Sequence, residues 1–112
     1  MAKIICIGSA CKDVFFPTQE GVVTDTPEDL MSRQKISFEL GAKYKVENRF
    51  ESLGGVAANV ASGLAKLGIE ASCYCNIGDD YISAWIKEQL DKNGVGTDRL
   101  SASVGTLGDF SA

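Results

Sequence analysis

The chain has 112 residues, of which 45% are hydrophobic and 23% charged, with a net charge of −4 and no histidine. This length predicts one small domain, and the acidic balance without a basic stripe argues against nucleic acid or membrane as a partner. Without histidine, Ser-His-Asp and Cys-His chemistry is excluded within this chain, and the quickly polar N-terminus is not that of a signal peptide, so a cytoplasmic location is expected.

Residues 3–8 form the first predicted element, a short isoleucine-rich run that ends in Gly8 and is followed by Ser9. Such a run is typical of a buried parallel strand. Ligands of open α/β sheets bind beyond the carboxyl ends of the strands, and Asp13 lies just past this end. Its carboxylate suits either of two roles, which position alone does not separate: binding two neighbouring hydroxyls of a polyol, or capping a turn.

Residues 34–50 alternate apolar and polar side chains on both sides of Gly41 and Ala42. This pattern predicts an antiparallel hairpin with glycine first in a type II′ turn. The preceding residues 17–32 are predicted to be an irregular connection. Because a lone hairpin is not stable in water, its apolar face needs a cover. From the pattern alone, the hairpin is interpreted as an ordinary hairpin packed on its own core.

A helix is predicted over residues 56–67, led by Gly54 and Gly55 and ended by Gly68. The glycine pair allows close approach of the backbone to a ligand, and the N–H groups of a helix start favour polar or anionic groups. Asn59, a poor helix former, lies one turn in. The residues that recur at the spacing of one helical face are Ala57, Val60, Ala61, Leu64 and Ala65.

A second strand is predicted over residues 71–77, which completes a βαβ unit with a right-handed crossover. Asp79 and Asp80 then begin a second helix, and we interpret them as capping residues rather than catalytic ones. Cys73 and Cys75 share one face of the strand, but a C-x-C pair without histidine is a weak metal pattern. Buried thiols in a reducing cytosol are the favoured interpretation, and no metal is expected here.

One ordered set of residues resembles the first signature of the ribokinase-like (PfkB) carbohydrate kinases. It comprises Gly54-Gly55-x-Ala57-x-Asn59-x-Ala61, then Leu64-Ala65-x-Leu67-Gly68, then Gly78-Asp79-Asp80. The resemblance implies an α/β fold, in which a ribokinase-like parallel-sheet core, partial here, carries an antiparallel β-hairpin lid. The family's second signature, with its catalytic Asp, is absent. The 112 residues are therefore expected to be the N-terminal part of a kinase domain whose nucleotide-binding half is missing.

The resemblance also implies a function, namely ATP-dependent phosphorylation of a hydroxyl on a sugar or sugar-like substrate. Substrate-binding roles carry over to Asp13, Gly54, Gly55 and Asn59, while no catalytic or metal-binding residue is assigned. ATP and Mg²⁺ would serve the full-length enzyme; this chain alone is expected to bind neither and to be inactive. The expected partners are a sugar or nucleoside and a second copy of the chain, in a homodimer formed through the lid.

Two alternatives belong to other classes of protein. The first is a non-catalytic sugar-binding or dimerisation module retained from a truncated sugar kinase, and the extent of the reading frame would separate it from the enzyme. The second is a dinucleotide-binding domain. It is the weaker alternative, because Gly8-Ser9-Ala10-Cys11 after the first strand lacks the G-x-G-x-x-G pattern.

Overall fold

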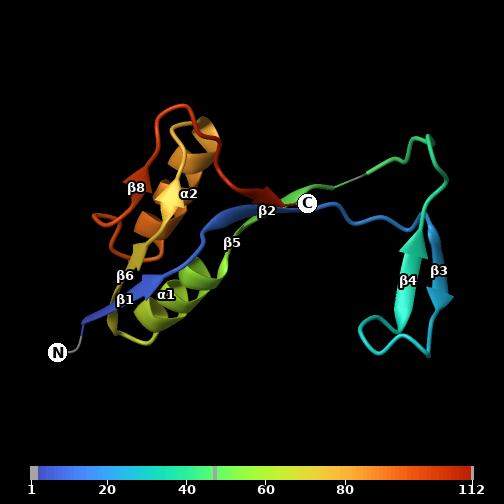
Figure 1. The fold of residues 1–112 in the computed structure, drawn as a ribbon, viewed down its shortest axis with the longest axis horizontal. Coiled ribbons are helices and arrows are strands. Elements are labelled where there is room, and N and C mark those ends of the chain that lie inside the picture. The colour runs from blue at the N-terminus through green and yellow to red at the C-terminus, as the bar shows by residue number, and fades with distance from the viewer. Residues whose placement is uncertain (1–2, 47, 112) are drawn as a thin grey trace. The chain divides into compact units, whose positions relative to one another are not determined.

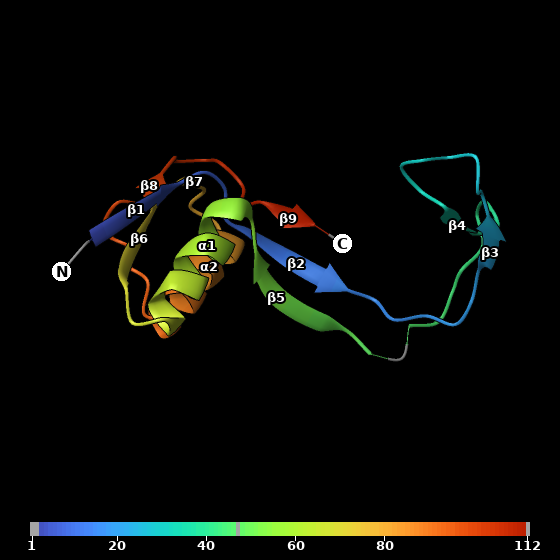
Figure 2. The same cartoon turned by 90° about the horizontal axis from the view of Figure 1, so that it is seen from below.

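The computed structural model describes residues 3–46 and 48–111, which form two compact units. The first unit comprises the chain up to Phe15 and from Glu51 onward, and the second is Phe16–Phe50. Figure 1 labels most of their elements, and Figure 2 labels the rest. Each unit is described by itself below.

The first unit is built on two parallel strands joined through a helix. Strand β1 (Lys3–Ile7) pairs with β6 (Glu70–Tyr74) in parallel, in register from Lys3 opposite Glu70 to Ile7 opposite Tyr74. Helix α1 (Val56–Lys66) lies between them in the chain and packs on both strands. The predicted parallel neighbours and their connecting helix are thus confirmed. Helix α2 (Tyr81–Lys92) follows β6.

Two further small sheets complete this unit. In the first, the order is β5 (Phe50–Gly54), β2 (Cys11–Phe15), β9 (Phe110–Ser111), with β9 parallel to β2. In the second, β7 (Asn76–Ile77) pairs in parallel with β8 (Ser101–Ala102). Strand β5 runs directly into α1, so the strand order places the start of α1 near β2.

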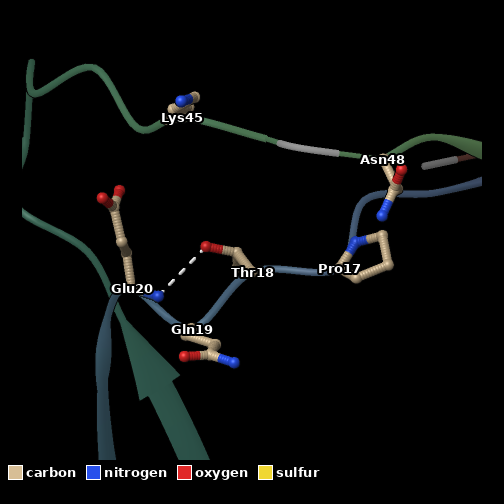
Figure 3. A pocket seen from close by; sticks show the side chains of 6 residues that line it. All are labelled: Pro17, Thr18, Gln19, Glu20, Lys45 and Asn48. Carbon is tan, nitrogen blue, oxygen red and sulfur yellow. Dashed lines mark hydrogen bonds between the residues drawn. The ribbon is translucent and has the colours of Figure 1, made fainter.

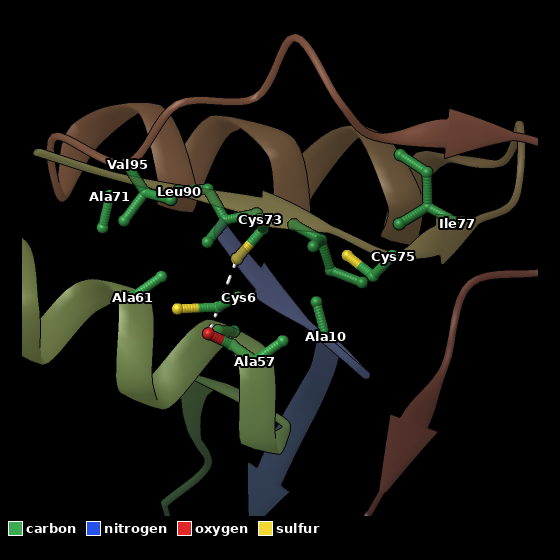
Figure 4. Packing of buried hydrophobic residues seen from close by; sticks show 12 residues of the cluster. Cys6, Ala10, Ala57, Ala61, Ala71, Cys73, Cys75, Ile77, Leu90 and Val95 are labelled. Carbon is green, nitrogen blue, oxygen red and sulfur yellow. Dashed lines mark hydrogen bonds between the residues drawn. The ribbon is translucent and has the colours of Figure 1, made fainter. Parts of the chain in front are cut away.

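Small side chains fill the core between α1, β6 and α2 (Figure 4). The thiol of Cys73 donates a hydrogen bond to the carbonyl oxygen of Ala57, 3.5 Å away. The neighbouring Cys75 thiol and burial both raise the pKa of Cys73, so it stays protonated. None of the four cysteines forms a disulfide; Cys6, Cys73 and Cys75 are buried and Cys11 is partly buried. The buried cluster consists of Cys6, Ala10, Ala57, Ala58, Ala61, Ala71, Cys73, Cys75, Ile77, Ile86, Leu90 and Val95.

The second unit contains an antiparallel pair, but not the predicted one. Strand β3 (Val22–Asp25) pairs with β4 (Gln34–Ser37), in register from Val22 opposite Ser37 to Asp25 opposite Gln34. Strand β4 thus pairs with the segment that precedes it in the chain, β3, which was expected to be irregular. After Gly41 the described residues up to 46 contain no strand, and Glu47, which the predicted hairpin included, lies outside the described residues.

The loop between β3 and β4 explains this change of partner. The Thr26 N–H donates to the Arg33 carbonyl at 2.7 Å, and Asp29 Oδ1 accepts from the N–H groups of Met31 and Ser32 at 3.0 and 3.2 Å. These bonds close the connection and bring the strand ends together. The predicted turn with Gly41 first is wrong, because the Ala42 N–H donates to the Glu39 carbonyl at 3.2 Å and Gly41, with φ 79°, is the second of the two central residues. No strand returns from this turn within the described residues up to 46.

Helix α2 begins as predicted, with an acidic cap. Asp80 Oδ1 accepts hydrogen bonds from Ser83 N at 3.0 Å, from Ser83 Oγ at 2.7 Å and from Gly108 N at 2.9 Å. Asp79 Oδ2 accepts from Gly105 N at 2.9 Å. The two carboxylates therefore also hold the loop that leads into β9. The hydrogen bonds from Gly108 and Ser83 lower the pKa of Asp80 from its usual 3.8.

We expect Asp80→Ala to lower the midpoint of thermal unfolding by several degrees, because alanine accepts none of the three hydrogen bonds that end on Asp80 Oδ1. A lowered pKa means that this stabilisation is fully present above pH 3.8 and is lost as the pH falls through the folded-state pKa. The difference between wild type and variant should therefore shrink on acidification below pH 3.8. Chemical unfolding across this range measures it, and a difference that does not depend on pH would contradict the assignment.

Neither helix is long and apolar enough to cross a membrane, within residues 3–46 and 48–111.

Candidate substrate-binding site

The glycine pair forms a tight passage between β5 and α1. Gly55 has φ 94° and ψ 147°, a conformation that is essentially confined to glycine. A Cβ atom built on Gly55 would lie 2.5 Å from the Ser9 carbonyl oxygen and 2.8 Å from Ala10 Cα. Both the backbone angles and the close approach to the chain after β1 therefore require glycine here.

The start of α1 is capped by the chain itself. Ser9 Oγ accepts from the N–H of Val56 and the Ser9 carbonyl oxygen accepts from the N–H of Ala58, both at 3.3 Å. The N–H groups of this helix start were expected to be free for a ligand, and for these two residues that expectation is wrong. Ser9 was missed because its partners lie more than forty residues away in the chain.

Asp13 lies directly against the glycine pair. A Cβ atom built on Gly54 would overlap Oδ2 of Asp13 and would lie 2.7 Å from the carboxyl carbon. The Cys11 thiol donates to Asp13 Oδ1 at 3.4 Å. Burial, followed by this bond to Asp13, raises the pKa of Cys11 to about 11, so Cys11 remains a thiol at neutral pH. The structure thus places a partly buried carboxylate beside a stretch of backbone that carries no side chains, Gly54 and Gly55.

Asn59 is exposed on the first turn of α1, and its N–H donates to the Gly55 carbonyl at 2.9 Å. It lines a polar hollow of about 390 Å³ that includes neither Asp13 nor the glycine pair among its lining residues. The structure therefore brings Asp13, Gly54 and Gly55 together and places Asn59 at a separate hollow. That Asn59 contacts the same ligand as Asp13 stays a prediction. The hollow is lined by Glu51, Ser52, Leu53, Asn59, Ser62, Lys66, Gln89 and Asn93.

Next to Asp13 on β2, Lys12 is a buried lysine that the sequence analysis did not single out. Its Nζ lies 3.1 Å from Glu51 Oε1, 5.0 Å from the centroid of the Trp85 ring and 5.9 Å from that of Tyr81. Neighbouring residues of a strand point to opposite faces, so Lys12 and Asp13 occupy different faces of β2. No local sequence pattern marks such a lysine, because its partners are distant in the chain.

Another hollow, in the second unit, has a volume of about 390 Å³ and contains none of the predicted site residues (Figure 3). The Glu20 N–H donates to Thr18 Oγ1 at 3.1 Å on its border. Within the ranges that the structure describes, no group of three or more Cys, Asp or Glu side chains is arranged to hold a metal ion. The hollow is lined by Pro17, Thr18, Gln19, Glu20, Lys45 and Asn48.

The structure is thus of the α/β class with a parallel core. Beside its first strand lie a carboxylate and a helix that is preceded by two glycines. Its sequence matches the family described as "pfkB family carbohydrate kinase" over residues 1–107. The chain belongs to this family.

Several proteins are similar to this chain. The chain is 34% identical over 65 residues to the 2-dehydro-3-deoxygluconokinase of Bacillus subtilis (strain 168), covering 58% of this chain and 20% of that protein. A ribokinase from Cryptococcus neoformans var. grubii serotype A in complex with ADP superposes with a TM-score of 0.68 and 24% identity, over 98% of this chain and 29% of that one. A Methanocaldococcus jannaschii nucleoside kinase gives a TM-score of 0.67 and 23% identity, over 96% and 31%.

These structural likenesses establish the ribokinase-like fold. The chain spans less than a third of the length of each of these three relatives.

Proposed function

We propose that this chain supplies the acceptor-binding part of an ATP-dependent kinase that phosphorylates a hydroxyl of a sugar or sugar-like molecule. One observation carries the proposal: in a member of the pfkB family, the Asp13 carboxylate lies against Gly54 at the start of α1. The names of the relatives, a sugar-acid kinase, a ribokinase and a nucleoside kinase, support a polyhydroxylated acceptor.

The chemistry of phosphoryl transfer is mostly positioning and charge stabilisation. Asp13 contributes to positioning, since a carboxylate with two oxygens can accept hydrogen bonds from two hydroxyls of one acceptor. A partly buried carboxylate left without such donors is costly, so the site selects a ligand that is rich in hydroxyls. The glycine pair lets the acceptor approach the backbone, and Asn59 is proposed to bind a further hydroxyl.

ATP would provide the phosphoryl group, and the ADP complex of the Cryptococcus relative supports an adenine nucleotide as donor. Mg²⁺ would neutralise the charge of the phosphates. The described residues show no cluster suited to a metal ion. Because the chain spans less than a third of the length of these relatives, we assign the catalytic base and the binding of Mg²⁺ and nucleotide to parts of the protein outside these residues. On this proposal, residues 1–112 alone catalyse no phosphoryl transfer.

The Phe16–Phe50 unit is proposed to act as the lid and as the contact of a homodimer. Its two strands expose apolar side chains that a cover would bury, among them Val22, Val23 and Ile36. Exposed apolar groups on a two-stranded ribbon favour association, because such a ribbon is marginally stable alone. The four free thiols support a reducing, cytoplasmic location.

Steady-state kinetics tests the proposed function. The protein at its natural length is incubated with Mg²⁺-ATP and a panel of pentoses, hexoses, 2-dehydro-3-deoxygluconate and nucleosides, and ADP release is followed. We expect acceptor-dependent ADP release with at least one of these compounds. Binding of a sugar by calorimetry without any ADP release would instead support the alternative, a non-catalytic sugar-binding module.

A further inference from the structure

Lys12 and Glu51 stand at the two points where the Phe16–Phe50 unit leaves and rejoins the first unit. Lys12 lies on β2, whose last residue, Phe15, is also the last residue before that unit, and Glu51 is the first residue after it. Strands β2 and β5, which carry the two residues, are hydrogen-bonded neighbours (Figure 2). The 3.1 Å contact between Lys12 Nζ and Glu51 Oε1 therefore joins the two ends of the inserted segment.

Burial distinguishes this ion pair from the other lysine pairs within residues 3–46 and 48–111. The Lys12 side chain is 7% exposed, whereas the lysines that pair with Glu70, Asp29 and Glu88 are 49–63% exposed. A lysine is almost never buried unless it is paired, because removing an ammonium from water is expensive. The Trp85 ring, with its centroid 5.0 Å from Nζ, adds a cation–π contact. A buried charge with this set of partners tolerates little displacement, so the pair acts as a geometric restraint.

The restraint acts on Asp13 through the backbone of β2. Lys12 and Asp13 are consecutive residues of one strand, so fixing the Lys12 side chain on one face turns the Asp13 side chain to the other. The Lys12 N–H also donates to the Asp109 carbonyl at 2.9 Å, which holds the backbone of β2 at Lys12 from the side of β9. On the opposite face, the Asp13 carboxylate lies against Gly54, which is on the same strand as Glu51.

We propose that Lys12 is a positioning residue for the acceptor site. Its ammonium, held by Glu51 and Trp85, joins the ends of the Phe16–Phe50 unit and keeps the Asp13 carboxylate against Gly54. The expected effect on acceptor use rests on the proposed function, whereas the expected effect on strand protection does not.

The test uses the protein at its natural length with Lys12→Met, which keeps the apolar stem and volume but removes the charge. We expect the KM for the acceptor to rise about 10- to 100-fold, as small misplacements of a binding group can cause, while the KM for ATP stays within about two-fold. Lys12→Arg keeps the charge and should recover most of the acceptor affinity. A role in folding alone would lower the yield of folded enzyme and leave both KM values unchanged, which would overturn the proposal.

Hydrogen exchange of the amides in β2 and β5 gives a readout that needs no activity. Exchange should be faster in Lys12→Met than in wild type, and unchanged in the matched control Lys92→Met, which breaks the exposed pair with Glu88. If no acceptor is phosphorylated by the wild type, the proposed function fails, but faster exchange still supports the geometric restraint by Lys12. Unchanged exchange in Lys12→Met overturns the proposed restraint, whatever the KM values are. If Lys12→Met does not fold, Glu51→Gln is measured in the same way, with the same two outcomes.

Discussion

In the protein at its natural length, Asp13→Ala is expected to lower kcat/KM for the acceptor by about 10²- to 10⁴-fold. Two hydrogen bonds from acceptor hydroxyls to a charged carboxylate contribute about 1.5–3 kcal/mol each. Folding should survive, because within residues 3–46 and 48–111 the Asp13 side chain accepts a hydrogen bond only from the Cys11 thiol, a weak donor 3.4 Å away. Steady-state kinetics with the acceptor varied at saturating ATP measures the effect.

Two controls separate binding from folding. Asp13→Asn keeps the shape of the side chain but loses its charge, so its effect should be smaller than that of alanine. Asp98→Ala removes an exposed carboxylate of the same unit and should leave the kinetics unchanged. If Asp13→Ala kept the acceptor kinetics of wild type, the assignment of the acceptor site to Asp13 would be wrong.

The parallel core was predictable because its information is local. The isoleucine-rich run of β1 and the alanine face of α1 each specify one element. The right-handed βαβ connection then leaves one arrangement for β1 and β6. The glycine pair was recognisable for a related reason, since only glycine serves a backbone passage of this kind.

The partner of β4 was not predictable from the same kind of pattern. Alternation of side chains in residues 34–37 predicts a strand but does not say which neighbour it pairs with. The choice depends on the Thr26–Arg33 hydrogen bond and on the turn at Asp29, which close the loop on the N-terminal side. Polar side chains that bond their own backbone decide such loops, and composition alone does not reveal them.

Long-range polar contacts were the other part that sequence reasoning missed. Ser9 caps a helix whose first residue is Val56, and Lys12 pairs with Glu51. Each pair forms only because the chain leaves at Phe15 and returns at Glu51 beside the same strands. The sequence placed Asp13 and the glycine pair in one site through family resemblance. The contacts that hold them there become visible only in three dimensions.

Gly55→Ala is expected to lower the free energy of unfolding by about 3 kcal/mol or more. The backbone angles of Gly55, φ 94° and ψ 147°, cost a residue with a side chain about 1–3 kcal/mol. The new methyl group would also lie 2.5 Å from the Ser9 carbonyl oxygen, and a backbone atom cannot rotate away. Relief requires the start of α1 to move from Ser9, which would break the bonds that cap Val56 and Ala58.

Gly63→Ala in the same helix is the matched control for this change. Nothing lies within 4 Å of a Cβ atom built on Gly63, so the methyl group should raise the free energy of unfolding by about 0.5–1 kcal/mol, the usual gain in a helix interior. Urea unfolding of both variants should therefore give shifts of opposite sign at a common m-value. If Gly55→Ala were as stable as wild type, α1 could start without its close approach to Ser9. The contact between Gly54 and Asp13 would then not depend on the close approach of Gly55 to Ser9.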